Sequence, residues 1–292
     1  MRVRSEYIRS LPLLFGRPVL AEFARTGHSA FFAHLISAAG LESSRSIAET
    51  YDVAFELLLR EYRCEYVFKN LIAQRLLLER HPWDEARLLS EFRVGIRKAD
   101  VVIVNGTSTV YEIKTGLDNL DRLREQLVAY QSVFDRIYVV CEATDADRIA
   151  AAAGDGIGVV TLTREGDLLE VRAAEPNAHD TIPACILGSL RKAEYLEIIR
   201  AENGHVPDLP NGLQWNACLE IARTLDPSSV HARMVEALRS RSADRGLCEI
   251  VANAPDSLKH ATLTLPASAP ERSRLVHALA TPSTAALTST RA

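Results

Sequence analysis

Hydrophobic and polar positions follow a helical period in the first part of the chain. Between residues 51 and 80, apolar side chains return every three or four positions, which predicts one long helix that Pro82 ends. Residues 1–48 carry shorter stretches of the same period, interrupted by glycine and proline. The first part of the chain is therefore predicted to be helical.

The pattern changes to short apolar runs in the middle of the chain. These runs are rich in β-branched residues and are separated by turn residues, which is typical of strands. The predicted strands are Phe92–Val94, Val101–Val104, Thr109–Ile113, Ile137–Cys141, Ile157–Leu162 and Leu168–Val171. Helices are predicted over Asp118–Phe134, with Asp118 as N-cap, and over Thr144–Ala153. Apolar strands that flank a helix indicate a sheet covered by helices, so we expect an α/β fold.

Only helical signals follow residue 181. The predicted helices cover Ile182–Glu202, Leu213–Thr224 and Ser228–Ser240, the last with a start signal at Asp226-Pro227. The final stretch is rich in Ala, Pro, Ser and Thr, which predicts a poorly ordered tail. The expected organisation is a helical extension (1–48), an α/β core (49–175), a C-terminal helical region (176–265) and a tail (266–292).

Composition narrows the classes of protein that fit. The chain has 292 residues, of which 47% are hydrophobic and 25% charged, as in a globular protein. A formal net charge of -4 means that any nucleic-acid-binding surface must be a local patch. The five cysteines show no zinc-ligand spacing and favour a reducing cytoplasm, and no apolar run is long enough for a membrane helix.

One segment, ADVVIVNGTSTVYEIKTG (residues 99–116), places charged residues in an apolar hairpin. Glu112 and Lys114 are two residues apart on a strand, so they share a face. A two-residue Asn105-Gly106 loop would put Asp100 on the opposite face, whereas a loop of odd length, such as 105–107, puts Asp100 opposite Glu112. We expect the odd-length loop, which brings the two carboxylates together.

Two carboxylates on adjacent strands, ~5 Å apart, repel each other unless a cation binds between them. Oxygen ligands of this kind suit Mg²⁺ or Mn²⁺, and the Lys114 ammonium on the same face could hold a water or a developing phosphoryl charge. The alternative is an exposed Glu–Lys pair on a polar strand face.

The arrangement of Asp100 and Glu112-Ile113-Lys114 resembles the PD-(D/E)xK nuclease superfamily, which has the restriction-endonuclease-like fold. The continuation EIKTGLDNLDRLREQLVAY is similar to an uncharacterised bacterial subfamily with the pattern EIK[ST]xxDxLxRLxxQxxxY. The resemblance implies an αβββαβ core with a mixed sheet, flanked here by helical extensions. It also implies Mg²⁺-dependent phosphodiester hydrolysis, with Asp100, Glu112 and the Ile113 carbonyl as metal ligands and Lys114 near the attacking water. Ala99 stands where the superfamily pattern has proline.

The resemblance also suggests supporting residues, each with a plainer alternative. Gln126 and Tyr130 match an element that related nucleases use at the site and on the DNA backbone, although Tyr130 also fits the helix core. Glu65 is the candidate for a helix glutamate near the metal, or else it belongs to an ordinary i, i+4 ion-pair row with Glu61 and Lys69.

Cationic residues lie close to the motif. Arg93, Arg97 and Lys98 precede Asp100, and Arg122 lies on the following helix; they could meet phosphates or form a solvated edge. The expected function is a cytoplasmic Mg²⁺- or Mn²⁺-dependent nuclease that acts on DNA rather than RNA. The alternative is a non-cleaving nucleic-acid-binding or regulatory protein on the same fold. The helical extensions could serve a second copy or a protein partner.

Overall fold

The computed structural model describes residues 4–41, 45–82, 85–116, 118–241 and 245–284. The chain forms two compact units. The described residues within 1–79, 164–166 and 244–292 form the helical unit, and those within 80–163 and 167–243 form the sheet unit. These units cut across the expected boundaries, because helices expected to belong to the α/β core pack instead with the N-terminal helices.

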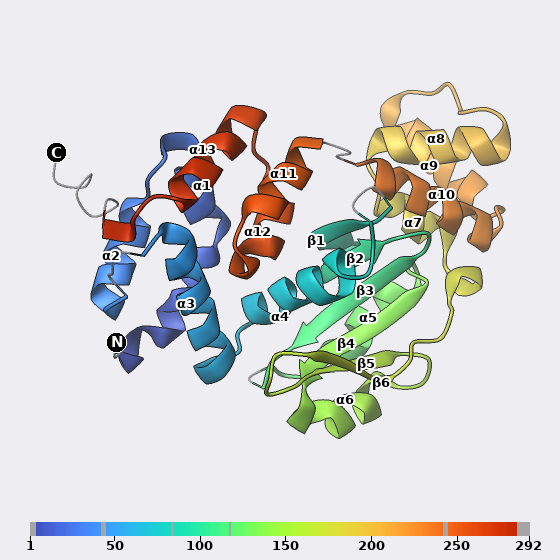
Figure 1. The fold of residues 1–292 in the computed structure, drawn as a ribbon. Coiled ribbons are helices and arrows are strands. Elements are labelled where there is room, and N and C mark those ends of the chain that lie inside the picture. The colour runs from blue at the N-terminus through green and yellow to red at the C-terminus, as the bar shows by residue number, and fades with distance from the viewer. Residues whose placement is uncertain (1–3, 42–44, 83–84, 117, 242–244, 285–292) are drawn as a thin grey trace. The chain divides into compact units, whose positions relative to one another are not determined.

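The sheet unit contains one six-stranded sheet whose strands lie in chain order (Figure 1). The strands are β1 (Arg87–Val94), β2 (Arg97–Val104), β3 (Ser108–Lys114), β4 (Arg136–Glu142), β5 (Gly158–Leu162) and β6 (Leu168–Arg172). The pairs β3–β4 and β4–β5 are parallel, and the other neighbours are antiparallel. The predicted strands and the mixed α/β class are confirmed.

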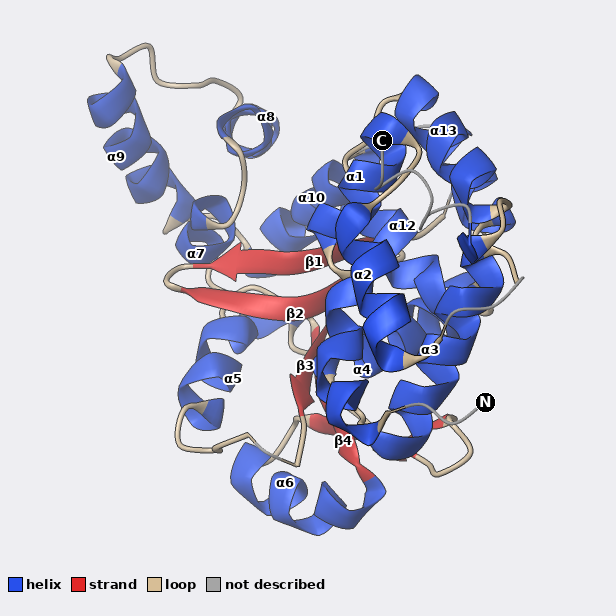
Figure 2. Cartoon of the chain, turned by 90° about the vertical axis from the view of Figure 1, so that its left-hand side faces the viewer, coloured by secondary structure: helices blue, strands red, loops and turns tan. Residues whose placement is uncertain are grey.

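Helices cover the apolar side chains of this sheet. Helices α5 (Leu123–Gln131) and α6 (Ala146–Ala153) pack against the strands, as Figure 2 shows, and η3 (Ala143–Asp145) leads into α6. The chain then continues through η4 (Ala178–Asp180), α7 (Pro183–Gly188), α8 (Lys192–Asn203), α9 (Asn211–Ala222) and α10 (Pro227–Ser240). Buried Val230, Met234 and Leu238 of α10 belong to the same hydrophobic core as Val102 and Val110 of the sheet. The C-terminal helices up to Ser240 are therefore part of the sheet unit.

The helical unit joins both ends of the described chain. Its elements are η1 (Ser5–Phe15), α1 (Arg17–Thr26), α2 (Ala30–Ala39), α3 (Ile47–Glu61), α4 (Glu65–Leu71), the π-helix η2 (Ile72–Leu78), α11 (Arg245–Asn253), η5 (Asp256–Leu258), α12 (Lys259–Thr264) and α13 (Ala269–Leu279). Helix α13 packs on α1, and the N–H of Ile47 donates to the carbonyl of Thr281 over 2.9 Å.

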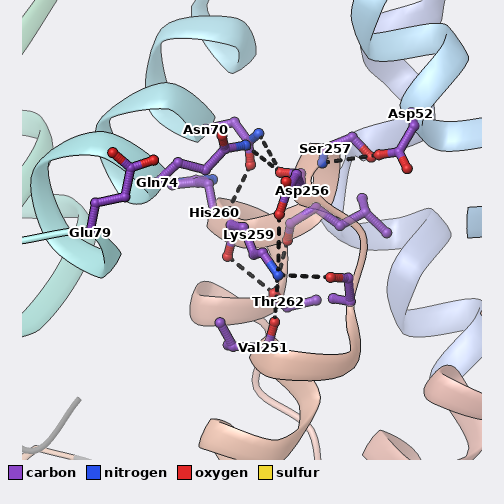
Figure 3. A network of polar contacts seen from close by, with 12 residues as sticks. Asp52, Asn70, Gln74, Glu79, Val251, Asp256, Ser257, Lys259, His260 and Thr262 are labelled. Atoms are coloured by element: carbon purple, nitrogen blue, oxygen red, sulfur yellow. Dashed lines mark hydrogen bonds and ion pairs between the residues drawn. The ribbon is translucent and has the colours of Figure 1, made fainter. Parts of the chain in front are cut away.

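Buried polar side chains fix the turn between α11 and α12 (Figure 3). The amide of Asn70 donates to the carbonyl of Asp256 over 2.9 Å and accepts from the N–H of His260 over 3.0 Å. The ammonium of Lys259 donates to the carbonyls of Val251 and Ala254, which lie at the end of α11. Because Asn70 is fully buried, these bonds stabilise the turn without competition from water.

The sequence expectations were wrong for two other helices and for the tail. The single helix over 51–80 is broken between Glu61 and Glu65, and the helix over 182–202 is broken between α7 and α8. The part of the expected tail that the structure describes contains α13, with Leu275, Ala278 and Leu279 buried; residues 285–292 lie outside the described residues. Among the described helices, none combines the length and the hydropathy that crossing a membrane requires.

Candidate metal and nucleic-acid site

The β2–β3 hairpin has the odd-length loop that the site requires. Val104 pairs with Ser108 and Val101 with Tyr111, so residues 105–107 form the loop and Asp100 stands opposite Glu112 at the next position. The N–H of Asn105 donates to the carbonyl of Thr107 over 3.0 Å and closes the loop. The predicted register is confirmed.

Asp100 turns its carboxylate towards strand β3. Its Oδ2 accepts a hydrogen bond from the backbone N–H of Ile113 over 2.8 Å, and its side chain is half-buried. Ile113, proposed as a carbonyl ligand, therefore contacts Asp100 through its N–H. The backbone between Glu112 and Lys114 thus fixes the position of the Asp100 carboxylate.

Glu112 and Lys114 form a buried ion pair with Gln126 of α5. Nζ of Lys114 donates to Oε1 of Glu112 over 2.9 Å, and the two residues are 9% and 2% exposed. The side-chain amide of Gln126 contacts both: it donates to Oε1 of Glu112 over 2.5 Å and accepts from Lys114 over 3.0 Å. A buried ion pair is tolerated when additional hydrogen bonds satisfy its atoms, and Gln126 supplies them here.

Tyr130, one helical turn after Gln126, reaches the other oxygen of Glu112. Its hydroxyl lies 2.8 Å from Oε2 of Glu112 and 2.8 Å from the carbonyl of Lys98, so one hydrogen serves two acceptors. Burial, and then the charge of Glu112, raise the pKa of the Tyr130 hydroxyl, and Asp100 adds to this. The hydroxyl therefore stays protonated and acts as a donor to Glu112. We call Glu112, Lys114, Gln126 and Tyr130 the carboxylate network.

Glu91 of β1 is a site residue that the sequence did not suggest. One of its carboxylate oxygens lies within 4.8 Å of one of Asp100. Its backbone has φ +53°, an uncommon conformation for a residue with a side chain. The β1–β2 pairing places Glu91 across from Asp100, because Ser90 pairs with Val101 and Phe92 with Ala99. The signal in the sequence was the short Gly95-Ile96 turn, which sets this register.

Other predicted residues lie outside the carboxylate network. Glu65 begins α4 in the helical unit and pairs with Lys69 at 2.5 Å, and its role near a metal stays a prediction. Asp118 is not the N-cap of α5: its Oδ2 accepts from the N–H of Thr115 over 2.7 Å, and the helix begins after Arg122. The turn that Asp118 closes delays the helix by several residues.

The predicted phosphate-binding residues differ in accessibility. Arg122 and Lys98 are exposed, whereas Arg97 is bound to Glu125 of α5. Tyr130 is fully buried, so it cannot reach a nucleic-acid backbone; its hydroxyl positions Glu112 instead. Of these residues, Lys98 lies beside a carboxylate, with its ammonium 3.9 Å from Glu91.

Comparison with known proteins places the chain in a family. Protein cII of Enterobacteria phage P4 is 32% identical over 105 residues, a match that spans 35% of this chain and 38% of that protein. No solved structure matches the chain. The family model described as Bacteriophage P4 protein cII matches residues 59–261, which is more than half of the chain. The chain therefore belongs to the bacteriophage P4 protein cII family.

Proposed function

We propose that this protein is a divalent-metal-dependent nuclease of the PD-(D/E)xK type that hydrolyses phosphodiester bonds of DNA. The observation that carries the proposal is the register of the β2–β3 hairpin, which puts Asp100 opposite Glu112 with Lys114 two residues further on. The order of strands and helices from β1 to β5 also fits the αβββαβ core, with α4 preceding it in the chain. DNA is favoured over RNA only through the resemblance.

The residues present fit a hard cation. Asp100 and Glu91 have carboxylate oxygens within 4.8 Å of each other, and Glu112 stands opposite Asp100 on β3; carboxylate oxygens are ligands that Mg²⁺ and Mn²⁺ prefer. When bound, such a cation would offset the negative charge of the phosphate and lower the pKa of a water. No histidine or cysteine enters this group among the described residues, which argues against zinc.

The chain's own residues position this chemistry. Lys114 carries a cationic group to within 2.9 Å of Glu112, where it can donate to an attacking water or to a phosphate oxygen. Gln126 and Tyr130 hold the two carboxylate oxygens of Glu112 and so set the orientation of the carboxylate. Preorganised donors and acceptors of this kind lower the cost of reorganisation during the reaction.

One observation favours the second candidate, a non-cleaving nucleic-acid-binding protein on the same fold. Glu112 already accepts hydrogen bonds from Lys114, Gln126 and Tyr130. A cation that binds Glu112 must therefore displace at least one donor. If the carboxylate network served only stability, the donors would not be displaced and no cleavage would occur.

The test is DNA cleavage by the full chain. Supercoiled plasmid and single-stranded DNA are incubated with wild type in Mg²⁺, Mn²⁺ or EDTA. Metal-dependent cutting that is lost in Glu112→Gln and in Lys114→Met supports the proposal. Glu170→Gln is the matched control, because Glu170 is an exposed carboxylate on another strand of the same sheet.

Circular dichroism and thermal unfolding must show that the variants fold, since breaking a buried ion pair costs about 3–5 kcal/mol. Binding of DNA without cutting in any metal would favour the non-cleaving candidate. If folded Glu112→Gln and Lys114→Met still cut DNA, Glu112 would not be a metal ligand and Lys114 would not act on the water or the phosphate.

A further inference from the structure

The turn between β1 and β2 exposes an isoleucine. Val94 pairs with Arg97, so Gly95 and Ile96 alone form the loop, and Gly95 has φ +57°. Ile96 is 92% exposed, more than any other large hydrophobic residue in the described part of the chain. A two-residue turn does not require isoleucine, and the side chain contributes nothing to the core. Ile96 is therefore available for contact with another molecule.

Two cations stand directly opposite each other beside this isoleucine. Arg93 pairs with Lys98 across the β1–β2 ladder, and both are exposed. Like charges at directly opposed positions destabilise a hairpin. Lys98 is 3.9 Å from Glu91, and Arg93 makes no ion pair with any residue that the structure describes. An anion bound at the hairpin end would relieve this repulsion.

The hairpin end is tied to the carboxylate network. The carbonyl of Lys98 accepts from the Tyr130 hydroxyl, which also reaches Glu112, and Arg97 is bound to Glu125 of α5. In Figure 2 the turn lies at the left end of β1 and β2. Glu91 and Asp100 lie further along these strands from the turn, because Ser90 pairs with Val101 and Phe92 with Ala99. A molecule held by the turn is thus held at a fixed position relative to Glu112.

We infer that the β1–β2 turn is a DNA-binding wedge: Ile96 inserts at a base step of duplex DNA, and Arg93 and Lys98 contact the flanking phosphates. Apolar side chains that enter between base pairs unstack them, and cations beside them hold the backbone. An exposed aliphatic residue beside two cations fits duplex DNA. The phosphates of the duplex can bind the cations, and the faces of its bases can contact the aliphatic side chain. The inference rests on the proposed function and names duplex DNA as the substrate class.

The test measures binding in EDTA, so that cleavage plays no part. A duplex of about two helical turns carries a fluorescein for anisotropy, and a second copy carries 2-aminopurine, whose fluorescence rises on unstacking. Wild type, Ile96→Ser and Arg93→Gln/Lys98→Gln are compared with Leu169→Ser, a control that removes an exposed leucine from β6. Ile96 and Leu169 are both exposed, so neither variant should disturb the fold.

Wild type and Leu169→Ser should bind the duplex and raise the 2-aminopurine signal. Ile96→Ser should bind roughly tenfold more weakly, since a buried isoleucine contact is lost, and should give no fluorescence rise. The double variant should lose affinity and show a smaller dependence on salt. Equal affinity and equal fluorescence for Ile96→Ser and wild type would overturn the wedge.

Failure of the wedge can be told from failure of the proposed nuclease. Metal-dependent cutting by wild type, together with unchanged binding by Ile96→Ser, overturns the wedge alone. Binding confined to single-stranded DNA also overturns it. Absence of both cutting and binding with every DNA overturns the two proposals together.

Discussion

The hydroxyl of Tyr130 lies 2.8 Å from Oε2 of Glu112, which joins helix α5 to strand β3 inside the sheet unit. This contact gives a specific prediction for Tyr130→Phe. The substitution keeps the buried ring and removes only the hydroxyl, so the buried carboxylate of Glu112 loses one hydrogen-bond donor. We expect the free energy of unfolding to fall by about 1–3 kcal/mol, measured by urea denaturation, and any metal-dependent cleavage to fall with it.

Tyr195→Phe is the control for this change. Tyr195 is also buried in the sheet unit, but no hydrogen bond of its hydroxyl occurs among the described residues. Its unfolding free energy should change by less than about 0.5 kcal/mol. Equal effects of the two substitutions would show that the Tyr130 hydroxyl does not support Glu112.

We expect the helical unit to lose stability in acid because of His260. Burial, and then the nearby Lys69 ammonium, lower the pKa of His260 from 6.5 to about 3. Between these pH values the unfolded chain binds a proton that the folded chain does not, so this contribution to stability falls as pH drops from 6.5 towards 3. The slope from this group is at most about 1.4 kcal/mol per pH unit.

The measurement is urea unfolding of wild type and His260→Gln at several pH values. The carboxylates contribute equally to both proteins, so the difference between the curves reports His260. The variant should show the shallower loss of stability below pH 6.5. Parallel curves would mean that the pKa of His260 is not lowered in the folded protein.

We expect the ionised carboxylate of Asp135 to hold in place the segment that leads to α7. Its carboxylate accepts from the N–H groups of Asn177 and Ala178, each over 2.9 Å, and from the hydroxyl of Thr107 over 2.8 Å. Burial opposes ionisation, but these hydrogen bonds and Arg136 prevail and lower the pKa of Asp135. Asp135→Asn directs an amide donor at other donors, so we expect a loss of about 1–3 kcal/mol in unfolding free energy.

The same urea experiment on Asp180→Asn supplies the comparison for Asp135. Asp180 is exposed, and within the described part of the chain its carboxylate pairs only with His179, so its substitution should cost less than about 0.5 kcal/mol. If Asp135→Asn lowered the unfolding free energy by as little as Asp180→Asn, the hydrogen bonds of Asp135 would not hold the segment that leads to α7.

The sequence predicted the site residues whose positions follow from strand periodicity. Glu112 and Lys114 share a face by alternation, and the three-residue loop brings Asp100 opposite Glu112. Glu91 was missed because its place depends on the pairing of another strand and on an unusual backbone conformation, neither of which periodicity reports. Tyr130 was assigned two roles from the sequence, and only its burial decides between them.

Helix boundaries were less predictable, although two signals were present. The apolar positions of residues 51–80 shift phase between Leu58 and Val67, because nine residues make two and a half turns, and the chain breaks there. For α13, the capping box of Ser268 and Glu271 was readable, as was the spacing of Leu275 and Leu279. The Ala-, Pro- and Ser-rich composition outweighed these signals.

The central claim is that Asp100 and Glu112 bind one divalent cation together. The most direct measurement is Mn²⁺ binding, followed through the electron paramagnetic resonance signal of free Mn²⁺ as protein is added. Wild type and Glu170→Gln should bind Mn²⁺ equally, whereas Asp100→Asn and Glu112→Gln should each weaken binding by roughly tenfold or more. Equal binding by all four folded proteins, or no binding by wild type, would contradict the claim.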